Sequence, residues 1–118
     1  MNESKTIEFS PISFNELIDA PKPNSIPSVQ YHKSFDNTKL AYYYFKTEKE
    51  PIARVIILHG GGAHSLAGYE HIADTLKNAY DISTYLLDLR GHGRSEGKRG
   101  DTPKIENVWQ DLKSFVSH

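Results

Sequence analysis

The chain has no cysteine among its 118 residues. Without a thiol it can form no disulfide, use no thiolate nucleophile and build no cysteine zinc site. An excess of basic charge is also missing, because the net charge is only −1, and nothing in the balance of charges therefore points to nucleic acid. What is left is the composition of an ordinary globular protein, long enough for one modest domain with a core.

Long hydrophobic runs are missing as well. The longest runs, such as "VIIL" at residues 55–58, are far shorter than the roughly 20 apolar residues of a membrane-spanning helix. The first residues, "MNESKTIEFSPISF", lack the apolar segment of a signal peptide. We therefore expect a cytoplasmic protein, and peripheral contact with lipid stays open.

Proline is concentrated in residues 1–28, at positions 11, 21, 23 and 27. Prolines this frequent block regular helix and sheet, so we expect an extended arm here. Residues 29–118 have a different character. We expect them to form the first part of one domain, beginning with a β-hairpin of "YHKSF" and "KLAYYYFK" around a turn at Asp36–Thr38. The aromatic run Tyr42–Phe45 would be a packing surface of the second strand.

Strand and helix patterns then alternate. The almost wholly apolar segment 53–60, "ARVIILHG", is typical of a strand buried on both faces of a parallel sheet. A helix follows, and its apolar stripe comprises Tyr69, Ile72, Ala73, Leu76 and Tyr80. Segment 81–89, "DISTYLLDL", reads as a second strand. This alternation predicts parallel βαβα units, and hence an α/β fold.

A last helix follows the loop "RGHGRSEGKRGD". Asp101 or Thr102 is suited to cap it, and Pro103 fits its first turn. One continuous apolar face is expected to join the core, and its members are Ile105, Val108, Trp109, Leu112, Phe115 and Val116.

The segment His59-Gly60-Gly61-Gly62 follows directly on the apolar strand. Glycines at that point let backbone N–H groups point into a cleft at the end of the strand, as an oxyanion hole requires. The same glycines also suit a tight strand-to-helix turn with positive φ. The residues alone leave both interpretations open.

Two longer segments, "ILHGGGAHSLAGYEHIA" and "YLLDLRGHGRSEGKRG", resemble the N-terminal part of an α/β-hydrolase. They are most similar to the monoacylglycerol lipase and lysophospholipase group, which is related to the S33 serine aminopeptidases. The resemblance covers about residues 31–118. It implies that the Gly61 N–H is an oxyanion donor, with His59, Gly60 and Gly62 beside the substrate. The second donor would follow the nucleophile, which this chain does not contain.

Residues 93–97, "GRSEG", match the G-x-S-x-G pattern of a nucleophile elbow, with Ser95 as the candidate serine. An elbow needs an apolar strand running into its first glycine and an apolar helix just after its serine. Here Arg90, Gly91 and His92 separate the strand from Gly93, and the charged segment 96–100 follows. We therefore expect Ser95 to be structural, with its hydroxyl bonded to the backbone.

The histidines and Asp88 are also candidates for catalytic or metal-binding roles. We expect His59 to stabilise its loop and His64 to form a hydrogen bond with the backbone. A metal pair of the two is not expected, because no carboxylate at ligand spacing joins them. His92 is expected in a solvated loop, and Asp88 is expected to stabilise a turn rather than to act as a triad acid. His118 is not expected to be the triad base. No metal and no cofactor are expected.

The resemblance implies a fragment, truncated before the nucleophile strand, of a serine hydrolase that cleaves lipid esters such as monoacylglycerols or lysophospholipids. By itself the chain would lack nucleophile, acid and base, and its sheet would be incomplete. Two alternatives stay open. One is a non-catalytic binding protein on half of the fold, and the other is a different hydrolase chemistry, namely that of an epoxide hydrolase, haloperoxidase or peptidase.

Overall fold

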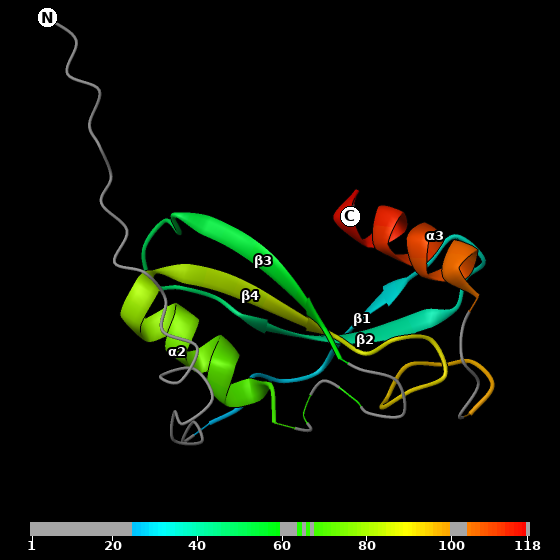
Figure 1. The fold of residues 1–118 in the computed structure, drawn as a ribbon, viewed down its shortest axis with the longest axis horizontal. Helices are drawn as coiled ribbons and strands as arrows, with labels where there is room; N and C mark the ends of the chain where they lie inside the picture. The colour runs from blue at the N-terminus through cyan, green and yellow to red at the C-terminus, as the bar shows by residue number, and fades with distance from the viewer. Residues whose placement is uncertain (1–24, 60–63, 65, 67, 100–103, 118) are drawn as a thin grey trace, which may run out of the picture.

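The computed structural model describes residues 25–59, 64, 66, 68–99 and 104–117. Within these ranges the elements follow in the order β1 (Gln30–Lys33), β2 (Lys39–Phe45), β3 (Ala53–Leu58), α2 (Glu70–Tyr80), β4 (Ile82–Leu87) and α3 (Ile105–Val116) (Figure 1). The strands form one sheet in the order β1-β2-β4-β3. β1, β2 and β4 pair antiparallel in turn, whereas β3 pairs parallel with β4. The predicted α/β fold, a hairpin followed by parallel βαβα units, is confirmed.

The β1–β2 hairpin turns where the sequence predicts it. Asn37 takes a φ of 67°, a left-handed conformation that asparagine tolerates better than most residues. The Thr38 N–H donates a hydrogen bond of 3.1 Å to Oδ1 of Asp36. Most of the proline-rich arm lies outside the described residues, and so do the predicted capping residues Asp101–Pro103.

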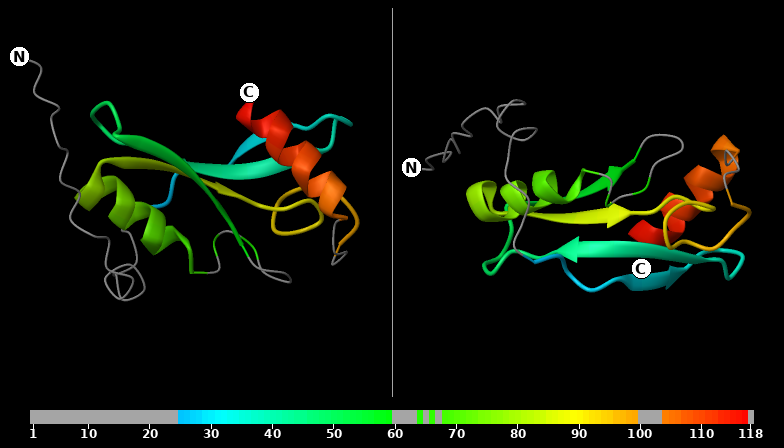
Figure 2. Two further views of the ribbon diagram at one scale, coloured as in Figure 1. Left: turned by 45° about the horizontal axis from the view of Figure 1, so that its top comes forward. Right: turned by 90° about the horizontal axis from the view of Figure 1, so that it is seen from below.

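The sheet has two packed faces, because successive side chains of a strand point to opposite sides. α3 covers one face, in a cluster of Leu40, Tyr42, Leu87 and Phe115. α2 covers the other face, in a cluster of Tyr43, Phe45, Ala73 and Leu86. The two helices therefore lie on opposite sides of the sheet, as Figure 1 and the left view of Figure 2 also show. The aromatic run of β2 supplies both clusters, so its predicted role as a packing surface is confirmed.

β3 lacks the burial on both faces that is typical of such an apolar strand. Ala53, Arg54 and Leu58 are exposed, and the three residues between them are only partly buried. The reason lies in the strand order, because β3 is the last strand of the described sheet and has a neighbour on one side only. An apolar run indicates a strand that could be buried, but the burial itself depends on a second neighbour.

The prediction that the whole apolar face of α3 joins the core is also wrong. Phe115 is buried and Leu112 packs against it, whereas Trp109 is 66% exposed and Ile105 and Val116 are similarly accessible. α3 meets the sheet near β1 and β2, through rings such as His32 and Tyr42. Within the described residues, the side of the helix that is turned away from these strands is therefore left largely exposed. No helix in the described ranges is long and apolar enough to cross a membrane.

Phe115 should hold α3 on the sheet. Its ring makes edge contacts with Tyr42 and Tyr85, at centroid distances of 5.0 and 5.5 Å. We predict that Phe115→Ala lowers the free energy of unfolding by about 3 kcal/mol, through lost burial and the cavity that remains. Urea denaturation followed by circular dichroism measures this. The neighbouring Val116→Ala is the control and should change stability by less than about 0.5 kcal/mol, because Val116 is 69% exposed. Equal losses in both variants would contradict the described packing.

Candidate functional site

The candidate site lies where the two parallel strands end. Leu58 of β3 stands beside Leu87 of β4, and the next residues along the chain are His59 and Asp88. In open α/β sheets, binding and catalytic loops gather at the carboxyl ends of parallel strands. The structure therefore brings the His59 loop and the loop after β4 together at the carboxyl ends of these two strands.

His59 joins the two loops. Its side chain is buried, and its Nε2 accepts a hydrogen bond of 2.9 Å from the Leu89 N–H. Because a backbone N–H can only donate, Nε2 of His59 is the acceptor in this hydrogen bond. The bond is the loop-stabilising contact expected for His59. Gly60, Gly61 and Gly62 lie outside the described residues, so the oxyanion role of Gly61 and the substrate contacts of these residues stay predictions.

His92 packs against His59, with ring centroids 5.3 Å apart. Its Nδ1 lies 3.0 Å from the carbonyl oxygen of Arg90, and because a carbonyl can only accept, Nδ1 is the donor. The prediction that His92 occupies a solvated loop is wrong, since its side chain is buried. The loop folds back over the end of β4, which a pattern rich in glycine and charge does not reveal. His64, by contrast, is exposed.

Ser95 completes the β2–β4 pairing. Ala41 and Asp88 stand opposite each other one step beyond the Tyr42–Leu87 pair, and the Asp88 N–H donates to the Ala41 carbonyl at 2.9 Å. Opposed residues of this kind normally exchange a second, return bond. Here the return path passes through Ser95, whose Oγ accepts from the Ala41 N–H at 2.8 Å and donates to the Asp88 carbonyl at 2.6 Å.

The Ser95 side chain is fully buried, with 0% of its surface exposed. Its proton is donated to the carbonyl oxygen of Asp88, and its Oγ accepts the Ala41 N–H, so both partners of the hydroxyl are backbone groups. The G-x-S-x-G match in "GRSEG" is therefore a coincidence of spacing in a tight turn. The expectation that Ser95 is structural, with its hydroxyl bonded to the backbone, is confirmed.

The carboxylate of Asp88 also stabilises this turn. Its Oδ2 accepts a hydrogen bond of 3.1 Å from the Arg94 N–H, and its side chain is buried. Gly93 takes a φ of 52° directly against this carboxyl group, and a Cβ added there would collide with the carboxylate. Only glycine fits that contact. Asp88 is thus the turn-stabilising carboxylate that was expected.

Arg90 is the most connected side chain of the site, and sequence reasoning missed it. Its Nε and Nη2 donate to the two carboxylate oxygens of Asp111 in α3, at 3.1 and 2.8 Å. Its Nη1 and Nη2 donate to Asp36 in the hairpin turn, at 2.7 and 3.1 Å. Ser34 adds a hydrogen bond of 2.5 Å from its Oγ to Asp111. Only the position of Arg90, first in its loop, hinted at this role.

The electrostatics follow from these contacts. The Arg90 guanidinium holds the pKa of Asp36 well below its usual range, mainly through the hydrogen bonds between them. In return the two carboxylates, Asp111 first and Asp36 second, raise the pKa of Arg90 further above its already high value. Arg90 is thus a permanent cation that ties the loop after β4 to the hairpin turn and to α3. Within the described residues no three histidine, aspartate or glutamate side chains gather as metal ligands.

The profile of the family described as serine aminopeptidase, S33, matches residues 49–118, which is more than half of the chain. The chain belongs to this family of α/β-hydrolases. The matched range begins just before β3 and includes both loops at the candidate site.

Individual relatives agree with this assignment. The chain is 31% identical to the monoacylglycerol lipase of Mycolicibacterium smegmatis, over 66% of this chain and 27% of that protein. It is 35% identical to the human monoglyceride lipase, over 65% of this chain and 25% of that protein. The structure of a soluble variant of the Saccharomyces cerevisiae monoglyceride lipase, in complex with a substrate analog, matches with a TM-score of 0.64 at 20% identity, over 85% of this chain and 32% of that one. The chain thus spans about a quarter of these curated relatives.

Removing the Ser95 hydroxyl should destabilise the fold. Ser95→Ala leaves the buried Ala41 N–H and Asp88 carbonyl without their bridging group, which should cost about 1–3 kcal/mol of unfolding free energy. Urea denaturation measures it. Ser117→Ala is the matched control, because Ser117 is exposed and its Oγ donates only to Lys113 of its own helix. A Ser95→Ala protein as stable as the control would show that the hydroxyl does not complete the ladder.

Losing Arg90 should loosen α3. Arg90→Ala leaves the carboxylate of Asp111 buried without its cation, and breaking a buried pair in this way costs about 3 kcal/mol. Arg90→Lys should recover only part of the loss, because an ammonium cannot serve two carboxylates with a planar fork. A double-mutant cycle with Asp111→Asn, read by urea denaturation, isolates the pairwise energy. Additive losses would contradict the assignment of Arg90 as the link.

Proposed function

We propose that this chain supplies the oxyanion-hole side of the active site of a serine hydrolase that cleaves carboxylic esters of lipids, such as monoacylglycerols or lysophospholipids. The observation that carries the proposal is the anchoring of His59 at the junction of β3 and β4, immediately before the glycines expected to form the hole. Membership of the S33 family and the names of the lipase relatives support it.

In the proposed reaction a serine outside this chain attacks the ester carbonyl carbon. Its proton passes to a base that is also outside this chain, and the carbonyl oxygen becomes an oxyanion. The Gly61 N–H donates a hydrogen bond to that oxyanion. The C–O bond to the alcohol then breaks, the alcohol leaves with a proton from the base, and water releases the acyl group from the serine as a carboxylic acid.

The described residues would contribute preorganisation. An oxyanion donor is effective when it is fixed in place before charge develops, so that no reorganisation is needed during the reaction. The bond from the Leu89 N–H to His59 fixes the residue at which the glycine segment starts. The Ser95 bridge and the Arg90 contacts fix the neighbouring loop against β2 and α3. Together these contacts would hold one wall of the site rigid.

The isolated 118-residue chain should not hydrolyse esters. Ser95, the one serine in a G-x-S-x-G pattern, is buried with its proton donated to a carbonyl. We predict no turnover of p-nitrophenyl butyrate and no labelling by a fluorophosphonate probe. Mass spectrometry of the treated chain, with Ser95→Ala beside it, locates any adduct. Labelling at Ser95, or hydrolysis that this substitution abolishes, would make Ser95 a nucleophile after all.

The backbone of Gly61 should matter more than its lack of a side chain. In the full-length hydrolase, Gly61→Pro removes the N–H, and we predict a loss of kcat of about 100-fold or more, as for other oxyanion donors. Gly61→Ala keeps the N–H and serves as the matched variant. The measurement is steady-state hydrolysis of a monoacylglycerol, with circular dichroism to check folding. A folded Gly61→Pro enzyme with unchanged kcat would place the oxyanion hole elsewhere.

A further inference from the structure

The side chain of His92 is buried at the candidate site, and the proposed reaction gives it no task. It is 8% exposed, although it comes from a loop rich in glycine and charge. Burying a polar ring costs free energy unless its polar atoms find partners. The contacts of the His92 ring therefore indicate what its burial achieves.

One hydrogen bond fixes the orientation of the His92 ring. Its Nδ1 lies 3.0 Å from the carbonyl oxygen of Arg90 in the same turn. A carbonyl oxygen can only accept, so the ring proton is on Nδ1. The backbone of His92 holds the turn as well, because its N–H donates to the Leu89 carbonyl at 2.9 Å and its carbonyl accepts the Ser95 N–H at 3.0 Å. The ring and the backbone from which it projects are therefore both held in place.

The fixed ring lies against His59. The two ring centroids are 5.3 Å apart, and the ring planes are tilted by 48°. Aromatic rings attract each other at this separation, and arrangements other than a face-to-face stack are favoured. His59 also accepts the Leu89 N–H at Nε2, and a neutral imidazole with an acceptor Nε2 carries its proton on Nδ1. This hydrogen bond therefore selects one tautomer of His59.

The contacts of the two histidines form a closed cycle through the backbone of Leu89. The N–H of Leu89 donates to His59, and the carbonyl oxygen of Leu89 accepts from the N–H of His92. The ring of His92 then returns to the ring of His59. A single hydrogen bond at Nε2 would leave the His59 ring free to rotate about the axis of that bond. The contact with His92 restricts this rotation.

His59 immediately precedes the glycine segment that contains Gly61. We infer that His92 is a positioning residue for the proposed hydrolysis. By restricting the His59 ring, it holds the start of the glycine segment, and hence the Gly61 N–H, where the oxyanion develops. This inference rests on the proposed function, because it takes Gly61 to be the oxyanion donor. A misplacement of about 1 Å in such a group can cost about 100-fold in rate.

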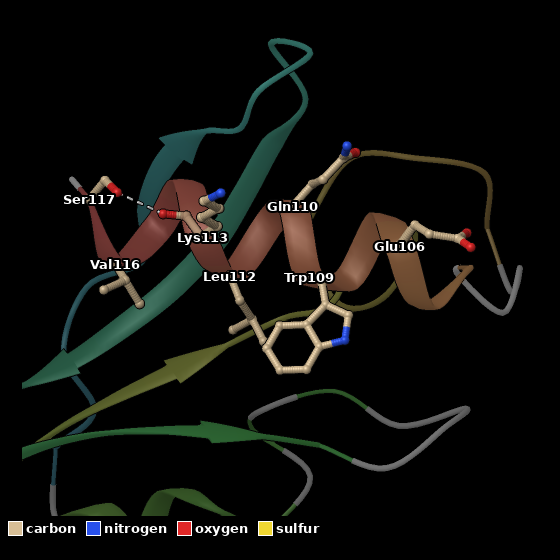
Figure 3. Close-up of a pocket in the computed structure, with 7 residues that line it drawn as sticks. All are labelled: Glu106, Trp109, Gln110, Leu112, Lys113, Val116 and Ser117. Atoms are coloured by element: carbon tan, nitrogen blue, oxygen red, sulfur yellow. Dashed lines mark hydrogen bonds between the residues drawn. The ribbon is translucent and has the colours of Figure 1, made fainter.

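His32 provides the matched comparison, because it is an equally buried histidine with contacts of the same kind. It is also 8% exposed, its ring centroid lies 5.6 Å from that of Phe115, and its Nε2 is 2.9 Å from Ser114 Oγ. His32 belongs to β1, at the opposite edge of the described sheet from β3. There it contacts α3, the helix shown close up in Figure 3. Losing His32 should therefore cost stability without disturbing the glycine segment.

The first readout is the tautomer of His59 in the 118-residue chain. Proton–nitrogen correlation NMR spectra distinguish a ring protonated at Nδ1 from one protonated at Nε2, and His59→Asn assigns the signal. At about pH 8, where an ordinary imidazole is neutral, we expect the unsubstituted chain to show only the Nδ1–H form. His92→Ala should give a mixture of both forms, whereas His32→Ala should leave the His59 signal unchanged. An unchanged His59 signal in folded His92→Ala would overturn the proposal.

Two further variants separate the ring of His92 from its hydrogen bond. His92→Phe keeps a ring beside His59 but cannot donate to the Arg90 carbonyl, whereas His92→Asn keeps a donor but has no ring. We expect His92→Phe to retain the Nδ1–H form of His59 and His92→Asn to lose it, because the ring contact is what restricts His59. This pair also decides the question if His92→Ala does not fold. Any other pattern in the folded variants would overturn the proposal.

The second readout is steady-state hydrolysis of a monoacylglycerol by the full-length hydrolase. An oxyanion donor acts mainly on the transition state, so displacing it lowers kcat and leaves KM nearly unchanged. We expect His92→Ala to lower kcat about tenfold or more, and His92→Phe to recover most of the loss. The loss should stay below that of Gly61→Pro, because the N–H is still present. His32→Ala should leave kcat of the folded enzyme unchanged, with circular dichroism to check folding.

The kinetic variants separate this inference from the proposed function. Unchanged kcat in folded His92→Ala, beside a Gly61→Pro enzyme that has lost activity, would overturn the positioning role and keep the oxyanion role. A raised KM with unchanged kcat would make His92 a substrate contact and would also overturn it. Unchanged kcat in folded Gly61→Pro would reject the proposed function and, with it, a role of His92 in the reaction. The NMR signal of His59 would then still decide whether His92 orients that ring.

Discussion

The turn after β4 is the constraint on which the rest of the described structure depends. Its first residues bond to the end of β3 through His59, and its Ser95 hydroxyl bridges β4 to β2. Arg90 then reaches both the hairpin turn and α3. This one short loop therefore contacts the ends of β2, β3 and β4 and the helix α3. Because the Ser95 bridge and the Asp111 carboxylate are buried, losing the contacts of either leaves a polar group without a partner where water cannot easily replace it.

The candidate site and the open edge of the described sheet belong to the same strand. β3 carries the His59 loop at its carboxyl end and also forms the open edge of the sheet. In an α/β sheet the loops that bind ligands gather at the carboxyl ends of the parallel strands, and His59 is held at that end of β3.

The periodic segments of the sequence were sufficient to predict the elements. Alternation and aromatic content located the hairpin strands, and the stripe through Ala73 and Leu76 located α2. The strand–helix–strand–helix order predicted parallel pairing of β3 with β4. Reasoning from the neighbours of Ser95 also rejected it as a nucleophile, because an elbow needs an apolar strand and helix that "GRSEG" does not have. These conclusions held because each depends on residues close together in the chain.

By itself the sequence determined the kind of each element, the class of fold and the structural character of Ser95. Burial was decided only by the tertiary structure: β3 is open because strand order leaves it at an edge, and Trp109 is exposed because α3 leans toward β1. The Arg90 link joins residues more than fifty positions apart, and the Ser95 bridge joins residues equally distant. No local pattern encodes such pairs. They exist because the turn after β4 folds back over the sheet, which places groups from separate segments within hydrogen-bonding distance.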